Sequence, residues 1–246
     1  MPSRFDVIFF DWGGTLASVA RQTESMLRGA TVAAEILIHS RDPADIESLV
    51  SAVVTAESQA GRDPQHREVD LHQLLTDWLQ RRGISTADGL IDQAIDAVGD
   101  SWIGSLDAYP GTVTALATLQ RQGVRMGLFS NVILPRRFCL RELERLAFAP
   151  YFDFVVTSSE VGYRKPAPQV YTAALKAAFG ERTPGDLSRA LFVGDSPAFD
   201  IIEPAKLGMK TAQVTTAPGI WPRDDHERAR PDYRIDAVAE LPDLIL

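Results

Sequence analysis

Polar side chains able to do chemistry follow four apolar segments of this 246-residue chain. Asp11 ends the run "VIFF", Ser130 and Asn131 end "GLFSN", Lys165 lies in "GYRKPAP", and Asp195 follows "LFVG". A carboxylate can act as a nucleophile or bind a hard cation, and an ammonium group can neutralise an anion. If the apolar segments are strands of one parallel sheet, these side chains lie at the edge where such sheets bind ligands.

The segments around these residues alternate between short apolar runs and helical patterns. Short apolar runs bounded by turn signals predict buried strands, and strands alternating with helices predict a parallel sheet covered on both faces. The expected strands are residues 7–10, 124–130, 152–158, 190–194, 211–215 and, at the edge, 232–235. The expected helices between them are residues 112–122, 135–147 and 168–179, with one more ending near Leu207.

Residues 20 to 104 have a different pattern, with about four amphipathic helices and no strand between them. The first helix is expected to bury one stripe of residues, Leu27, Ala30, Ala34 and Leu37. Asp42 and Pro43 are typical of the start of the second helix, and Ser85 or Thr86 is expected to cap the fourth. The chain therefore reads as an α/β core interrupted by a small all-helical insertion.

Composition narrows the class of protein. Hydrophobic residues make up 45% and charged residues 24% of the chain, which is ordinary for a soluble globular protein. The net charge of −8 argues against a nucleic-acid or anionic-membrane surface. One cysteine, Cys139, excludes an intrachain disulfide, and its helical context predicts a buried small hydrophobe. No segment has the length and apolarity of a signal peptide or membrane span, so we expect a cytoplasmic protein, monomeric or homodimeric.

Taken together, these segments resemble the motifs of the haloacid dehalogenase (HAD) superfamily. "FFDWGGTL" is similar to its first motif, "LFSN" to the second, "RKPAPQVY" to the third and "LFVGDSPAFDIIEPAKLGM" to the fourth. The resemblance implies an α/β Rossmann-like parallel sheet core with helices on both faces and a helical cap domain inserted between the first two motifs. The implied core comprises residues 1–16 and 108–246, and the implied cap comprises residues 17–107.

The resemblance also implies roles for the residues in the motifs. Asp11 would be the nucleophile, attacking phosphorus to form an aspartyl phosphate. Asp11, Asp195 and the backbone carbonyl of Gly13 would bind Mg²⁺, because hard oxygens suit a hard cation.

Other residues of the motifs would support these groups. Lys165 would neutralise the nucleophile and the phosphoryl oxygens, and Ser130 and Asn131 would bind the phosphorylated substrate. Thr15 and Asp200 would support the metal ligands without binding the metal themselves, with Asp200 orienting a metal-bound water or Lys165. Two simpler interpretations stay open: Asp200 as a capping acid of the following helix, and Ser130 as an ordinary strand-to-helix cap.

Gly13 departs from the pattern of the phosphatases in this superfamily. These enzymes normally carry a second Asp there, which protonates the leaving oxygen and later takes a proton from water. A positioned general acid–base contributes about 10²–10⁴ in rate. The sequence therefore predicts the groups that form a phosphoenzyme, but not the acid that an alkoxide leaving group needs.

Other hydrolases of the superfamily fit the sequence less well. The 2-haloacid dehalogenases use no metal and lack the "GD" that contains Asp195. Phosphonoacetaldehyde hydrolases need a cap lysine, whereas the four lysines here are Lys165, Lys176, Lys206 and Lys210. We therefore predict a Mg²⁺-dependent phosphatase acting on a small phosphorylated metabolite. The alternative is a weak or inactive member that binds a phosphorylated ligand or a protein partner.

Overall fold

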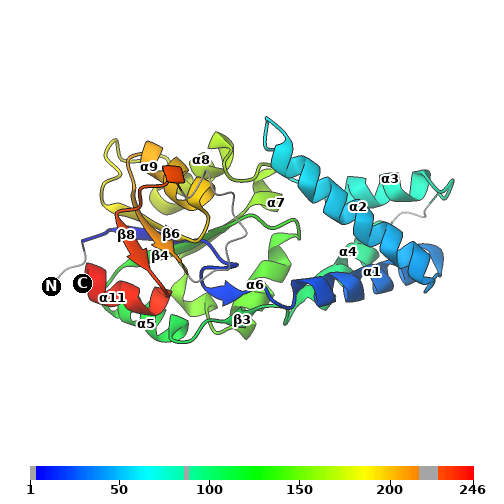
Figure 1. Cartoon of the computed structure of the whole chain (residues 1–246), viewed down its shortest axis with the longest axis horizontal. Coiled ribbons are helices and arrows are strands. Elements are labelled where there is room, and N and C mark those ends of the chain that lie inside the picture. The colour runs from blue at the N-terminus through cyan, green and yellow to red at the C-terminus, as the bar shows by residue number, and fades with distance from the viewer. Residues whose placement is uncertain (1–3, 86–88, 216–226) are drawn as a thin grey trace.

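The computed structural model describes residues 4–85, 89–215 and 227–246. Within them, one parallel sheet has six strands in the order β5-β4-β1-β6-β7-β8 (Figure 1). The strands are β1 (Val7–Phe10), β4 (Arg125–Ser130), β5 (Phe154–Thr157), β6 (Ala190–Gly194), β7 (Lys210–Val214) and β8 (Tyr233–Ile235). The predicted parallel sheet is confirmed, and the three strands followed by polar residues, β4, β1 and β6, are neighbours at its centre.

Helices cover both faces of the sheet, as predicted (Figure 1). The longer ones are α5 (Thr112–Arg121), α6 (Arg136–Arg145) and α8 (Pro168–Phe179). The shorter ones are η1 (Ala149–Tyr151), α7 (Ser158–Val161), η2 (Pro197–Ile202), α9 (Glu203–Lys206), η3 (Val238–Glu240) and α11 (Leu241–Ile245). Helices α5, α6 and α11 contribute to the core on one face, and α8 contributes to the core on the other.

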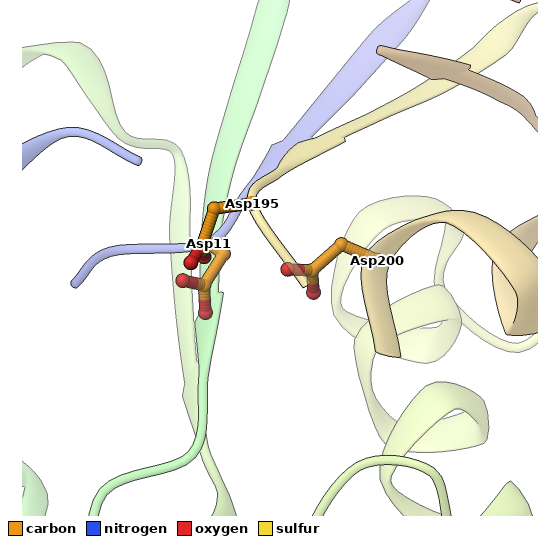
Figure 2. Close-up of side chains that lie close together, drawn as sticks. All are labelled: Asp11, Asp195 and Asp200. Atoms are coloured by element: carbon orange, nitrogen blue, oxygen red, sulfur yellow. The ribbon is translucent and has the colours of Figure 1, made fainter. Parts of the chain in front are cut away.

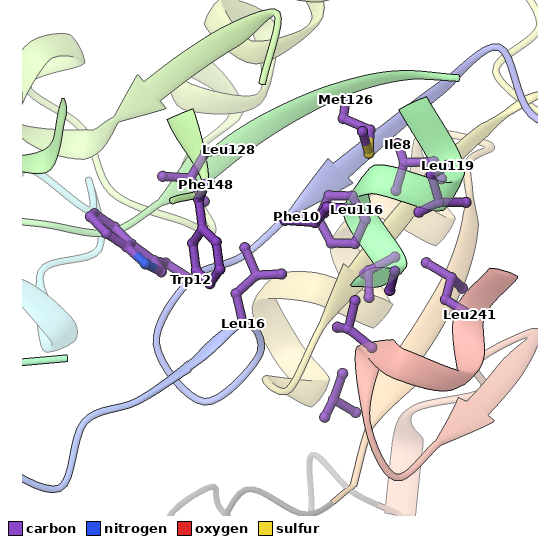
Figure 3. Packing of buried hydrophobic residues seen from close by; sticks show 14 of the residues in the cluster. Ile8, Phe10, Trp12, Leu16, Leu116, Leu119, Met126, Leu128, Phe148 and Leu241 are labelled. Atoms are coloured by element: carbon purple, nitrogen blue, oxygen red, sulfur yellow. The ribbon is translucent and has the colours of Figure 1, made fainter. Parts of the chain in front are cut away.

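Strand β1 shows why an unbroken apolar run is needed at the centre of this sheet. Ile8 and Phe10 belong to the core beneath α5 and α11 (Figure 3), whereas Val7 and Phe9 pack beneath α8. Successive side chains of a strand point to opposite faces, so a strand covered on both sides must be apolar at every position. All four residues are buried, and the strand presents its first polar side chain only where it ends.

Among the described residues, four helices lie outside the layers of the sheet and form a separate body beside it (Figure 1). These are α1 (Gln22–Ile38), α2 (Pro43–Arg62), α3 (Leu71–Gln80) and α4 (Leu90–Trp102). We refer to residues 22–102 as the helical unit. It has its own apolar core, which includes Leu37, Leu49, Trp78 and Ile95. The chain enters and leaves it through an antiparallel pair, β2 (Ala17–Ser18) and β3 (Asp107–Ala108), which the sequence did not predict.

The ends of the helices in this unit were predicted with mixed success. Asp42 caps α2 as expected, because its side chain accepts the backbone N–H two residues further on at 2.9 Å. Helix α4 is instead preceded by Gly89, whose φ of 88° is accessible to glycine, and not by Ser85. Thr86, the other predicted cap, lies outside the described residues.

The prediction that Leu27 belongs to the core of the helical unit was wrong. Leu27 is 54% exposed, although it was assigned to the buried stripe of α1. The stripe runs through Ser25 and Gly29, both buried, and Leu27 lies two residues from each. Residues two apart on a helix point in nearly opposite directions, so Leu27 faces away from the core. The small residues of α1 are the ones that approach α4, where Gly29 meets Val98.

Two of the predictions from composition concern the cysteine and membrane-spanning segments. Cys139 is buried as expected, and burial raises the pKa of its thiol to about 12, which keeps it protonated. None of the described helices combines the length and the apolar composition that crossing a bilayer would require.

Candidate active site

The central strands bring their polar residues to one edge of the sheet. Asp11 directly follows β1, Ser130 ends β4 and Asp195 directly follows β6. The backbone N–H of Asp11 donates to the carbonyl of Val193 at 2.9 Å, which fixes the end of β1 against β6. All three polar side chains are buried, as is that of Lys165, which reaches the same place from the turn between α7 and α8.

Lys165 connects two carboxylates at this edge. Its Nζ lies 2.8 Å from Oδ1 of Asp11 and 2.7 Å from Oδ1 of Asp200, and its side chain is only 2% exposed. Burial by itself would lower the pKa of the ammonium group, but the charges of Asp11 and Asp200 outweigh burial and raise it above its ordinary value. Lys165 is therefore a fixed positive charge beside Asp11.

Ser130 binds the side chain of Asp11, and Asn131 binds the backbone of Lys165. The Ser130 hydroxyl donates to Oδ1 of Asp11 at 3.0 Å, the oxygen that Lys165 also contacts. The other oxygen of Asp11, Oδ2, accepts neither bond. Asn131 accepts the backbone N–H of Lys165 at 2.8 Å and donates to its carbonyl at 3.3 Å. Its amide thus fixes the backbone of Lys165; a role in substrate binding stays a prediction.

Three carboxylates converge at the site. Figure 2 shows Asp11 and Asp195 side by side, with Asp200 directed toward them from the next element. One oxygen from each lies within 4.8 Å of the other two. Lys165 brings one positive charge against these three acids, so it does not balance the cluster by itself. Buried negative charge that needs compensation, supplied by hard oxygens, fits a divalent cation such as Mg²⁺.

Asp200 is held by backbone as well as by Lys165. Its Oδ2 accepts the N–H of Ser196 at 3.0 Å, while its own N–H donates to the Ser196 carbonyl at 2.9 Å. Burial, together with the charges of Asp11 and Asp195, raises the pKa of the Asp200 carboxyl above its ordinary value against the opposing effect of Lys165. Asp200 contacts Lys165, and its role in orienting Lys165 or a metal-bound water stays a prediction.

The loop after β1 is shaped around Asp195. Thr15 donates its hydroxyl to Oδ1 of Asp195 at 3.4 Å. Gly14 has a φ of 83°, and a Cβ on it would lie 2.7 Å from Oδ2 of Asp195. The second glycine of "GG" is thus required by both backbone conformation and space. The loop can approach Asp195 closely only because Gly14 has no side chain.

Gly13 is different, because its backbone does not adopt a positive φ. A Cβ there would lie 2.8 Å from Cγ1 of Val19, so a larger residue requires the Val19 side chain to shift. The backbone conformation at position 13 therefore does not require glycine, and a residue with a carboxylate could adopt it. That the Gly13 carbonyl binds metal stays a prediction.

Besides the β2–β3 connection, the helical unit contacts the segment before Lys165. The N–H of Arg164 donates to the carbonyl of His66 at 2.9 Å, and the N–H of Glu68 donates to the carbonyl of Gly162 at 3.0 Å. The carboxylate of Glu68 also lies 3.4 Å from the Arg164 guanidinium, with the two side chains 1% and 17% exposed. No local motif identified Glu68, because its partner lies almost a hundred residues away; Arg164 was visible only as the neighbour of Lys165.

Breaking this ion pair should destabilise the protein. Glu68→Gln leaves the guanidinium of Arg164 without its counter-charge in a largely buried position, and we expect a loss of about 2–3 kcal/mol. Urea unfolding followed by circular dichroism measures the change. Glu35→Gln, which removes half of the exposed pair with Arg41, is the control and should have a much smaller effect. Equal losses in the two variants would mean that the Glu68 pair adds nothing beyond a surface contact.

Aromatic packing also connects the helical unit to the core of the sheet. Trp12, the residue after Asp11, packs edge to face against Trp102 at the end of α4, with ring centroids 5.5 Å apart. Trp12 is buried in the core of the sheet, and Trp102 packs against that core and the core of the helical unit. The end of α4 is thereby fixed one residue from Asp11.

Curated proteins similar to this chain include two archaeal enzymes. One is named ribulose-1,5-bisphosphate 5-phosphatase, from Halopiger xanaduensis, and is 30% identical over 61% of this chain and 62% of its own length. The other is named glyceraldehyde 3-phosphate phosphatase, from Pyrococcus abyssi, and is 28% identical over 83% of this chain and 79% of its own. The match therefore spans less than two thirds of the first relative.

The fold and the family follow from two further comparisons. A solved structure of 2-haloacid dehalogenase from Pseudomonas syringae pv. Tomato DC3000 superposes with a TM-score of 0.70 over 98% of this chain and 97% of that chain, at 22% identity. A family model described as haloacid dehalogenase-like hydrolase matches residues 5–208, which include the first three sequence motifs and all of the fourth except Met209. The chain belongs to the haloacid dehalogenase-like hydrolases.

Proposed function

We propose that the protein is a Mg²⁺-dependent phosphatase that acts on a small phosphorylated metabolite through an aspartyl phosphate on Asp11. The observation that carries the proposal is the environment of Asp11. Lys165 and Ser130 both bind its Oδ1, so the carboxylate is held in one orientation with its charge opposed by a fixed ammonium group. The names of the two archaeal relatives support a phosphorylated substrate.

In the first step, Asp11 attacks phosphorus with Oδ2, the oxygen that Lys165 and Ser130 leave uncovered. The bond from phosphorus to the leaving oxygen breaks as the new bond to Oδ2 forms, which gives a mixed anhydride and an oxyanion of the organic part. Two anions approach each other here, and the charge of Lys165 reduces their repulsion. Ser130 is placed to donate its hydroxyl to the phosphoryl group.

In the second step, a water oxygen bonds to phosphorus as the bond from phosphorus to Oδ2 of Asp11 breaks. Hydrogen phosphate leaves, the Asp11 carboxylate is restored, and the proton that the water loses passes through solvent to the oxyanion of the organic part. Asp11, Asp195 and the Gly13 carbonyl would bind Mg²⁺, with Asp200 and Thr15 holding Lys165 and Asp195 in place. Bound Mg²⁺ would supply charge stabilisation for the phosphoryl oxygens. The helical unit, proposed to be the cap, excludes bulk water from the edge of the sheet.

The experiment is hydrolysis of 4-nitrophenyl phosphate and acetyl phosphate with Mg²⁺ and with a chelator. We expect turnover that falls about 10²-fold or more on chelation and returns with Mg²⁺, because a metal supplies several kcal/mol and each 1.36 kcal/mol is a tenfold rate change. Asp195→Asn should be equally impaired at all Mg²⁺ concentrations. Its exposed counterpart Asp92→Asn, on α4, should behave as the wild type.

Two results would count against the proposal. Chloride release from 2-chloropropionate that persists in chelator would favour a dehalogenase. Binding of phosphorylated ligands without turnover of either phosphate would favour the alternative, a non-catalytic member of the family.

A further inference from the structure

A pocket of about 300 Å³ lies between the helical unit and the sheet, beside the proposed catalytic site. Asn131 and Arg164 contribute to its wall from the side of the sheet. These two residues are the chain neighbours of Ser130 and Lys165, which bind Asp11. The rest of the wall comes mainly from α1, α2 and α4. The pocket therefore adjoins the residues that follow Ser130 and precede Lys165 in the chain.

The wall of the pocket is largely apolar. Several of its side chains are partly exposed, among them Met26, Val53, Val98, Trp102 and Ile133. These apolar groups face the pocket instead of packing completely into either core. An apolar ligand that covers them would remove their surface from water, which is favourable by about 25 cal/mol per Å².

The charges around the pocket are already compensated. Among the described residues that line it, two are charged, Arg164 and Glu57. Arg164 is paired with Glu68, whose carboxylate is almost completely buried. Burial, opposed in part by Arg164, raises the pKa of the Glu57 carboxyl. Whether Glu57 is ionised or protonated, the described wall holds no positive charge without an acidic partner.

We propose that this pocket takes the organic part of the substrate and selects monophosphates whose organic part is apolar and has no second anionic group. The proposal rests on the phosphatase function proposed above and names its substrate class. A second carboxylate or phosphate in the pocket would meet mainly apolar side chains, the Glu57 carboxyl, and an Arg164 guanidinium whose charge is already opposed by Glu68. Burying a charge that has no counter-charge of its own is strongly unfavourable. Bisphosphates and phosphorylated organic acids would therefore bind poorly.

The size of the pocket limits the organic group. Its volume is about 300 Å³, about twice the ~150 Å³ of an apolar cavity that holds one benzene molecule. The pocket thus has room for an aromatic ring with a substituent or an aliphatic group of similar size. A para-substituted benzyl group is therefore a suitable probe.

The test is calorimetric binding of two phosphonates, which cannot be hydrolysed, in buffer with Mg²⁺. One is 4-methylbenzylphosphonate, and the other is 4-(carboxymethyl)benzylphosphonate, which adds a carboxylate at the far end. We expect the wild type to bind the methyl compound at least about tenfold more tightly, since its partner must bury an unpaired charge.

Two matched variants separate the pocket from the rest of the helical unit. Val54 lines the pocket and is 48% exposed, whereas Val32 lies on α1, is 36% exposed and is not part of the wall. Val54→Arg places a cation at the pocket and should shift the preference toward the carboxymethyl compound by about tenfold. Val32→Arg adds the same charge elsewhere and should leave the ratio of the two affinities unchanged.

Equal affinities in the wild type, tighter binding of the carboxymethyl compound, or no binding of either compound would each overturn the proposal. A shift in Val32→Arg as large as that in Val54→Arg would do so as well, because it would show a general charge effect. The phosphatase proposal fails separately, through loss of phosphate release from 4-nitrophenyl phosphate. A protein that prefers the methyl phosphonate but hydrolyses nothing would keep the selective pocket and lose the reaction.

Discussion

Asp11→Asn should lower the rate of 4-nitrophenyl phosphate hydrolysis by about 10⁴-fold or more, as expected when the nucleophile of a covalent mechanism is removed. The amide is nearly the same size as the carboxylate, and its oxygen can still accept the bonds from Lys165 and Ser130. Lys165 also keeps its ion pair with Asp200. The fold should therefore persist while the attacking charge is lost. Initial rates, together with circular dichroism of the purified variant, measure the two effects separately.

Asp6→Asn is the matched control, because Asp6 lies five residues earlier on the same segment and forms an exposed ion pair with Arg189. Exposed pairs contribute little, so this variant should retain the wild-type rate and stability. If a folded Asp11→Asn protein kept most of its activity, the nucleophile would have to be another group.

Gly13→Asp should increase the hydrolysis of alkyl phosphates. The wild type has no side chain at position 13 to protonate the leaving oxygen, so we expect its rate to fall steeply as the leaving group becomes more basic. Aryl and acyl phosphates should be turned over far better than sugar phosphates. An aspartate at position 13 supplies the missing general acid, which is worth about 10²–10⁴ in rate for an alkoxide and little for a good leaving group. Rates on a series of alkyl and aryl phosphates measure the change in slope.

The design must allow for Val19, which a Cβ at position 13 would approach to 2.8 Å. Gly13→Asp should therefore be tested with and without Val19→Ala, which removes the contacting methyl group. Gly13→Asn has the same shape but no acidic proton, and it should not improve alkyl substrates. Two results would contradict the expectation: wild-type rates that do not depend on the leaving group, or a folded Gly13→Asp protein that improves on no alkyl phosphate. Either would mean that another group supplies the proton.

The sheet could be predicted because its strands are simple in composition. β1 and β6 are buried on both faces, so they are continuous apolar runs that no surface helix would have. Once the strands are parallel, the positions of Asp11, Ser130 and Asp195 follow from where the runs end. Lys165 lies beyond a strand, and its place at the site depends on Asn131 and the acids that bind it.

The helical unit was harder to predict in detail. The amphipathic pattern identified its helices, but the stripe of α1 includes small residues such as Gly29, whose burial the pattern of large apolar residues does not indicate. Leu27 was assigned to the core for that reason. The pair β2–β3 has two residues per strand, too short for any periodicity. The Glu68–Arg164 contact joins distant segments, and neither residue type indicates its partner.

The edge-to-face contact of Trp12 and Trp102 means that the chain contains its own optical reporter. One indole is attached to the backbone beside Asp11, and the other ends α4 of the helical unit. With centroids 5.5 Å apart, the two rings perturb each other's excited states, and the perturbation weakens steeply as the rings separate. The intrinsic fluorescence of the unlabelled protein therefore contains a component from this pair, beside the signal of the two other tryptophans, that depends on the separation of the helical unit and β1. A change in that separation would be visible without an attached dye.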